Sequence, residues 1–131
     1  MRTTTSLLAA AVALTGLTAC SGSSDDDKAT SSSGPETAVT TYTAAYFKGD
    51  ATTAYEALSK RCKGKIGPDA YAGVVKQAST EYGTDHPATD VQADVSGDMA
   101  RVTYKVKGLP KFDQEAQPWA REGGAWRYDA C

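Results

Sequence analysis

The sequence predicts an α+β fold, in which N-terminal helices pack on one face of a curved, cone-like antiparallel sheet of about four strands. Apolar residues recur at helical spacing over residues 35–82. From Pro87 onward they alternate with polar residues instead, which is the period of a strand with one wet face. Helices first and strands afterwards favour an antiparallel sheet over alternating βαβ units.

Three helices are expected in the first half of this domain. Gly34-Pro35-Glu36 and Gly67-Pro68-Asp69 each place a proline at the first helical position and an acid in the first turn. Gly49 and Gly83 are stop signals, and Asp50 is positioned to cap the helix between them. The three apolar stripes are Val39, Tyr42, Thr43, Tyr46 and Phe47; Ala54, Tyr55 and Leu58; and Tyr71, Val74, Val75, Ala78 and Tyr82.

The first expected hairpin turns at Ser96-Gly97-Asp98. Apolar residues occupy every second position both in the strand before this turn and in the strand after it, so each strand has one apolar face. The inward residues are Val91, Ala93 and Val95, followed by Ala100, Val102, Tyr104 and Val106.

A second hairpin is expected between residues 115–122 and 125–130, joined by Gly123-Gly124. Trp126 and Tyr128 share one face of its last strand. Pro118 lies within the first strand and cannot donate a ladder hydrogen bond, so we expect an edge position or a bulge there.

The start of the chain predicts an exported protein that is held at a membrane. Arg2 precedes the uncharged run 7–17, which is about half the length that a helix needs to span a bilayer. The sequence Leu17-Thr18-Ala19-Cys20 then resembles the lipobox of bacterial lipoproteins. The resemblance implies a signal peptide over 1–19, lipidation of Cys20, and a location on the outer face of the cytoplasmic membrane. The alternative is an ordinary secretory signal with Cys20 as a free thiol.

Residues 20–35 are expected to form a flexible Ser/Asp-rich tether, because they hold no large apolar side chain. Residues 36–131 then make one domain of ordinary size. The formal net charge of −2 gives no reason to expect nucleic acid as a partner.

Cys62 and Cys131 are predicted to form a disulfide, because an exported chain folds in an oxidising compartment. Closing a loop of roughly seventy residues would contribute about 4 kcal/mol on the chain-entropy model. A reactive or metal-binding thiol pair is the alternative, but no second histidine or cysteine lies near enough in the sequence to complete a metal site.

Three segments resemble the nuclear transport factor 2-like superfamily, and in particular its small secreted bacterial lipoproteins. They are Tyr46-Phe47-Lys48-Gly49-Asp50, the face Ala54, Tyr55 and Leu58, and the hairpin 119–127. The resemblance covers most of 36–131 and implies three helices closed against a bent sheet, with a pocket between them. It also implies a bridge between a cysteine after the second helix and one at the last strand. Isomerases and dehydratases of this superfamily place an acid or a His–Asp pair inside the cone.

No catalytic residue is assigned on this basis. His86, the only histidine, falls in a loop, where a solvated turn residue is favoured over a base. The strand carboxylates Asp94, Glu115 and Asp129 alternate opposite the apolar face or lie near its ends. A carboxylate buried by the cone would have a raised pKa and act as a base, but none of the three is selected.

A basic cluster surrounds Cys62. It would bind phosphate or an anionic envelope polymer, or it is a solvated helix end with its cations near the helix C-terminus. Its members are Lys60, Arg61, Lys63 and Lys65.

Large aromatic residues either fill the core of the cone or line a pocket for an apolar ligand. The candidate lining is Tyr46, Tyr55, Tyr71, Tyr104, Trp119 and Trp126. No cofactor and no metal ligand is assigned. We therefore expect a membrane-anchored, non-enzymatic lipoprotein that binds a small apolar ligand or an envelope protein, with homodimerisation left open. The alternatives are an isomerase- or dehydratase-type enzyme that uses a pocket carboxylate, and a purely structural or assembly role.

Overall fold

The computed structural model describes residues 33–131. The predictions for the signal peptide, for Cys20 and for most of the tether lie outside these described residues. Four helices precede four strands: α2 (Pro35–Lys48), α3 (Ala51–Glu56), α4 (Lys60–Lys63), α5 (Pro68–Tyr82), β1 (Ala88–Ser96), β2 (Met99–Val106), β3 (Gln114–Glu122) and β4 (Ala125–Tyr128), with a 3₁₀ turn, η1 (Pro110–Phe112), between β2 and β3.

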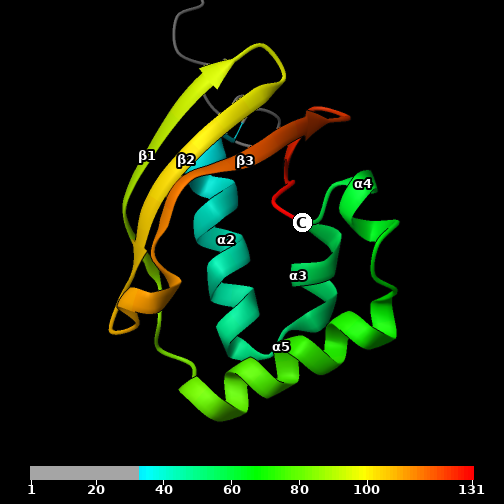
Figure 1. Cartoon of the computed structure of the whole chain (residues 1–131), viewed down its shortest axis with the longest axis vertical. Helices are drawn as coiled ribbons and strands as arrows, with labels where there is room; N and C mark the ends of the chain where they lie inside the picture. The colour runs from blue at the N-terminus through cyan, green and yellow to red at the C-terminus, as the bar shows by residue number, and fades with distance from the viewer. Residues whose placement is uncertain (1–32) are drawn as a thin grey trace, which may run out of the picture.

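The strands form one antiparallel sheet in the order β1-β2-β3-β4. Helix α2 packs along the concave side of this sheet, α5 lies beyond α2 and away from the strands, and α3 packs beside α2 and α5 (Figure 1). The predicted α+β fold, with helices on one face of an open antiparallel sheet, is confirmed.

The helix boundaries follow the local signals in the sequence. Gly49 ends α2 in the left-handed region at φ 80°, where a side chain would be strained. Asp50 then caps α3, because its Oδ1 accepts a hydrogen bond from the Thr53 backbone N–H at 3.1 Å. Helix α3 ends at Glu56, so Leu58 lies outside it and pairs with Tyr128 in an isolated bridge.

Helix α4 is one turn that the apolar period did not indicate, because four residues are too few to show one. Ser59 caps it by accepting from the Cys62 backbone N–H at 3.1 Å. The Ser59 hydroxyl in turn donates to Asp129 at 2.6 Å, and Arg61 pairs with the same carboxylate at 3.1 Å. The chain end is thereby fastened to α4.

Two bulges bend the sheet around the helices. In the β1–β2 pair the register shifts between Thr89 and Gln92 of β1. In the β2–β3 pair it shifts between Val102 and Tyr104 of β2. A non-glycine residue with φ 51° marks each bulge, Asp90 on β1 and Ala116 on β3. Tyr104 and Val106 of β2, and Gln114 and Gln117 of β3, lie beside the second bulge and line the cavity described below.

Pro118 is not on an edge strand, because β3 pairs on both sides. Its carbonyl accepts from the Asp129 backbone N–H at 3.1 Å, just past the last β3–β4 pair, Trp119 with Tyr128. The missing N–H of Pro118 points to this same side, beyond the end of the ladder, so the proline breaks no strand pair. Of the two alternatives predicted for Pro118, the edge position is wrong, whereas β3 does carry a bulge at Ala116, two residues before the proline.

Val95 is also misplaced by the alternation, since 49% of its surface is exposed. It lies close to the Gly97 turn, where the β1–β2 hairpin extends past the N-terminal end of α2 (Figure 1). The two-residue period assigns a face to a side chain, but it does not show whether a helix covers that face.

Cys62 and Cys131 form a disulfide that spans 69 positions and joins α4 to the chain end. Within residues 33–131, no helix is long and apolar enough to cross a membrane.

Candidate ligand-binding pocket

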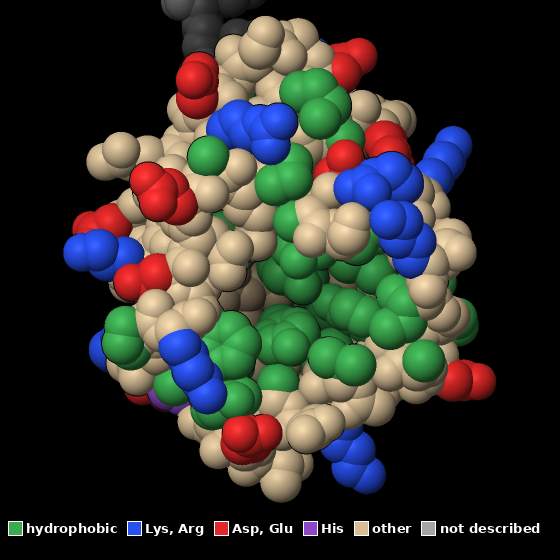
Figure 2. Space-filling view, in the orientation of Figure 1, with side chains coloured by type: hydrophobic (Ala, Val, Ile, Leu, Met, Phe, Trp, Pro, Cys, Tyr) green, Lys and Arg blue, Asp and Glu red, His purple; other side chains and the backbone are tan. Residues whose placement is uncertain are grey.

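A cavity of about 440 Å³ lies between α2, α5 and the bent part of the sheet. Figure 2 shows its mouth as a hollow surrounded by hydrophobic side chains. Aliphatic residues and the Cys62–Cys131 disulfide form part of its wall. Seven aromatic residues form most of the remainder: Tyr42, Tyr46, Phe47, Tyr71, Tyr104, Phe112 and Tyr128.

Three of the six candidate lining residues reach this cavity: Tyr46, Tyr71 and Tyr104. Tyr55, Trp119 and Trp126 lie outside its wall. The residues that sequence reasoning did not assign to the lining include Thr43, Phe112 and Gln117.

The three aromatic residues outside the cavity each have a structural role. Tyr55 donates from its hydroxyl to the Ile66 carbonyl at 3.3 Å and so ties α3 to the loop before α5. Trp119 is fully buried and packs edge-on against Tyr42 and Tyr128, two residues of the cavity wall. Trp126 lines a smaller hollow on another part of the surface, where the Arg121 guanidinium lies 5.3 Å from its ring.

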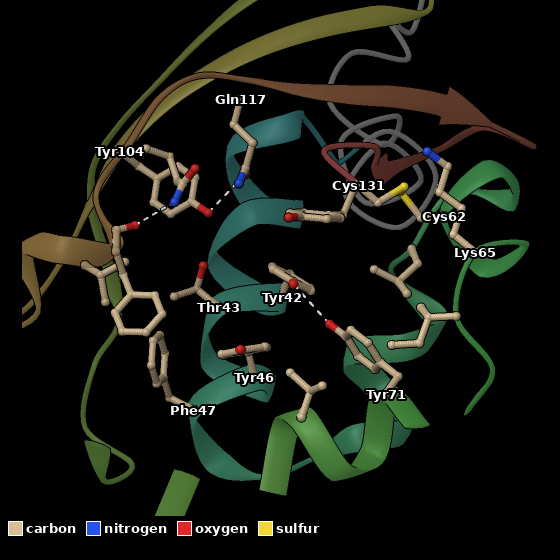
Figure 3. Close-up of a pocket in the computed structure, with 17 residues that line it drawn as sticks. Tyr42, Thr43, Tyr46, Phe47, Cys62, Lys65, Tyr71, Tyr104, Gln117 and Cys131 are labelled. Atoms are coloured by element: carbon tan, nitrogen blue, oxygen red, sulfur yellow. Dashed lines mark hydrogen bonds between the residues drawn. A yellow bond between two sulfur atoms is a disulfide. The ribbon is translucent and has the colours of Figure 1, made fainter. Parts of the chain in front are cut away.

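Tyr42 and Tyr71 meet on the helical side of the cavity. Their hydroxyl oxygens are 3.0 Å apart, and the bond joins α2 to α5 (Figure 3). Both side chains are more than nine-tenths buried.

Burial raises the pKa of the tyrosines in this wall. The pKa of Tyr71 and that of Tyr104 rise to about 12, mainly because burial penalises the phenolate. Burial also raises the pKa of Tyr42, Tyr46 and Tyr128 above the ordinary value, and nearby tyrosines add to the effect. At neutral pH the cavity therefore presents uncharged hydroxyls.

Gln117 and Tyr104 form the polar part of the sheet side. The Tyr104 hydroxyl and the Trp119 indole N–H both donate to Gln117 Oε1, at 3.0 and 2.9 Å. Figure 3 shows the Gln117 side chain extending from the sheet into the cavity, with Thr43 on α2 facing it. The signal for Gln117 was present in the sequence, because it lies two positions before Trp119 on an alternating strand.

Thr43 places a hydroxyl in the same region. Its side chain is 3% exposed, and the neighbouring Tyr104 hydroxyl already donates to Gln117 Oε1. No atom of the described chain has hydrogen-bond geometry with Thr43 Oγ1.

The carboxylates considered from the sequence do not line the cavity. Asp94 and Glu115 are exposed, and Asp129 binds Ser59 and Arg61. Among the cavity-lining residues described, none is an aspartate, a glutamate or a histidine.

His86 joins the end of α5 to the end of β2. Its Nε2 lies 2.6 Å from the Tyr82 carbonyl oxygen, and its Nδ1 lies 2.7 Å from the Lys107 carbonyl oxygen. Both partners only accept, so the doubly protonated ring satisfies both. The hydrogen bond to Lys107, followed by that to Tyr82, raises the pKa of His86.

The members of the basic cluster have different neighbours. Arg61 pairs with Asp129, and Lys63 lies 3.6 Å from Glu56 and 5.5 Å from the centre of the Tyr55 ring. Lys65 reaches the cavity wall next to the disulfide (Figure 3). The side chains of Arg61 and Lys63 therefore pair with carboxylates, whereas that of Lys65 borders the cavity.

Within residues 33–131 there is no group of three or more histidine, cysteine, aspartate or glutamate side chains placed to hold a metal ion. Comparison with protein-family models, with curated proteins and with solved structures found no match to this chain.

Proposed function

We propose that this protein is a lipoprotein anchored through Cys20 on the outer face of a bacterial cytoplasmic membrane, and that its nuclear transport factor 2-like domain binds a small, mainly apolar ligand. The observation that carries the proposal is the cavity of about 440 Å³, whose wall is mostly aromatic and aliphatic. Cavities of a few hundred Å³ with a few convergent polar groups are typical of small-molecule sites.

Its concave shape favours a small molecule over an envelope protein as the occupant. A protein partner needs a broad contact surface, whereas a small ligand is mostly enclosed by its site. In a filled core the aromatic side chains would pack against one another, whereas here seven of them border the cavity.

An isomerase- or dehydratase-type reaction has less support. General acid–base catalysis at neutral pH works best with a group whose pKa lies near 7. The titratable groups that the cavity wall does offer are tyrosines, with pKa values raised further from neutrality, and Lys65.

Binding of the uncharged dye Nile red to the purified protein tests the ligand proposal. Val74 lines the mouth of the cavity and is 43% exposed, so Val74→Trp should block entry without disturbing the core. Val95→Trp is the matched control, because Val95 is 49% exposed and lies outside the cavity wall. We expect saturable fluorescence enhancement with the wild type and with Val95→Trp, and its loss with Val74→Trp. Equal binding by all three proteins would overturn the proposal.

The anchor is tested separately, by mass spectrometry of the protein expressed in bacteria. We expect an N-terminal peptide that begins at Cys20 and carries a diacylglyceryl group. An unmodified thiol at Cys20, or cleavage at another bond, would refute the anchor and leave the pocket proposal standing.

A further inference from the structure

The orientation of the Gln117 amide is determined by its neighbour. The Trp119 indole nitrogen can only donate, so the Gln117 atom at 2.9 Å from it must be the oxygen. The Tyr104 hydroxyl donates to the same oxygen. The Gln117 amide nitrogen is therefore on the opposite side of the amide group. Within residues 33–131 it has no hydrogen-bond partner, and it is open to solvent in the cavity rather than fully buried.

Thr43 provides a second unsatisfied group in the same part of the cavity. Its hydroxyl is buried, and no described atom is in hydrogen-bond geometry with it. A buried polar group without a partner costs free energy, so such groups in native proteins usually have a water or a ligand as the missing partner. Gln117 Nε2 supplies two N–H donors, and Thr43 Oγ1 supplies one O–H donor.

We propose, on the basis of the ligand-binding function above, that the ligand is an uncharged ring compound bearing a carbonyl oxygen, and that Gln117 Nε2 and Thr43 Oγ1 donate to this oxygen. In the empty protein, water can serve both groups. A ligand oxygen that replaces the water keeps these hydrogen bonds, whereas a purely apolar ligand leaves both groups unpaired.

The rest of the wall selects against a charged ligand. The neighbouring hydroxyls are neutral tyrosines within a largely apolar wall, so a buried ionised group would lose its hydration without a counter-charge beside it. Lys65 is the cationic residue of the wall, and it lies next to the disulfide, on a different side from Gln117 and Thr43 (Figure 3).

Three probes of similar size separate these contributions: 2-acetylnaphthalene, which carries a carbonyl, 2-ethylnaphthalene, which has no oxygen, and 2-naphthoate, which is an anion. Their affinities for the purified protein are measured by isothermal titration calorimetry. We expect the acetyl compound to bind about tenfold more tightly than the ethyl compound, as one or two buried hydrogen bonds would give. We expect 2-naphthoate to bind more weakly than the acetyl compound.

Thr43→Val removes one donor and keeps the side-chain shape. Because the Thr43 hydroxyl has no partner in the fold, this variant should remain folded, which a urea titration verifies. It should reduce the preference for the acetyl compound by about threefold or more, which is the loss expected for one hydrogen bond. Thr40→Val is the control on the same helix, because Thr40 Oγ1 bonds to the Glu36 carbonyl outside the cavity.

The side-chain amide resonances of Gln117 provide a second readout that does not depend on a variant. They should shift when the acetyl compound binds and stay in place with the ethyl compound. Equal or tighter binding of the ethyl compound would overturn the carbonyl assignment and leave the ligand-binding function intact. Failure of all three probes to bind would overturn both.

Discussion

The hydroxyls of Tyr42 and Tyr71 lie 3.0 Å apart and join the helix that supports the sheet to the helix that closes the cavity. Either oxygen can be the donor. Because both side chains are buried, each hydroxyl depends on the other to offset its loss of hydration.

The pair should therefore behave non-additively in a double-mutant cycle. Tyr71→Phe and Tyr42→Phe each leave one buried hydroxyl unpaired, so each should lower the free energy of unfolding by about 1–3 kcal/mol. The double variant should cost less than the sum of the two single losses. Urea denaturation measures all four proteins, and strict additivity would show that the two hydroxyls do not form the bond.

Alkaline pH should destabilise the fold. The pKa of Tyr71 and that of Tyr104 are raised to about 12 in the folded state, compared with about 10 in the unfolded chain. Their contribution is complete below pH 10 and is lost as pH rises through about 12, because the unfolded chain releases these protons first.

Urea titrations between pH 9 and 12 test this dependence. The stability should fall with pH, with each of these tyrosines adding at most about 1.4 kcal/mol per pH unit. Tyr104→Phe should make the slope shallower. A slope unchanged in this variant would mean that Tyr104 ionises at its ordinary pKa in the folded state.

His86 should make stability depend on pH near neutrality. Its pKa is raised by the Lys107 and Tyr82 carbonyls, so its stabilising effect is complete below pH about 6.5 and is lost as pH rises through the higher folded value. The neighbouring charges are those of Asp85, which favours the imidazolium, and Lys107, which opposes it.

Because His86 is the only histidine, its ring resonances report its pKa directly by NMR. We expect a value above 6.5, and we expect His86→Gln to flatten the stability profile between pH 6 and 8. A measured pKa at or below 6.5 would contradict the doubly donating ring.

Removing the disulfide should weaken both the fold and the pocket. The bridge spans 69 positions, and its loss by Cys62→Ala/Cys131→Ala should cost about 2–5 kcal/mol of unfolding free energy. Nile red affinity should fall as well, because both cysteines belong to the cavity wall. Cys20→Ala is the control and should change neither the unfolding free energy nor the Nile red affinity. An equal loss in this control would show that the effect is not due to the Cys62–Cys131 disulfide.

The sequence predicted the main elements because their signals are local. Proline at the first helical position, acids in the first turn and Gly49 at a left-handed stop define helix ends without reference to the rest of the chain. The two hairpins follow from alternation and glycine turns. The single turn of α4 and the 3₁₀ turn η1 were missed, because elements of three or four residues show no period.

The cavity was only partly predictable for a different reason. Periodicity identifies Tyr104 and Trp119 as inward-facing, but whether a residue borders a space depends on where the sheet bends. That bend occurs at Asp90 and Ala116, two non-glycine residues with positive φ that no turn motif marks. Trp119 is fully buried and does not border the cavity, whereas Gln117, two positions earlier on the same face, reaches it.

The ligand-binding cavity and its two donors are tested together by a crystal structure of the protein grown with 6-bromo-2-acetylnaphthalene. We expect a bromine anomalous peak inside the cavity, with the acetyl oxygen within hydrogen-bond distance of Gln117 Nε2 and Thr43 Oγ1. Bromine located only on the outer surface, with the cavity closed by rearranged aromatic side chains, would contradict it.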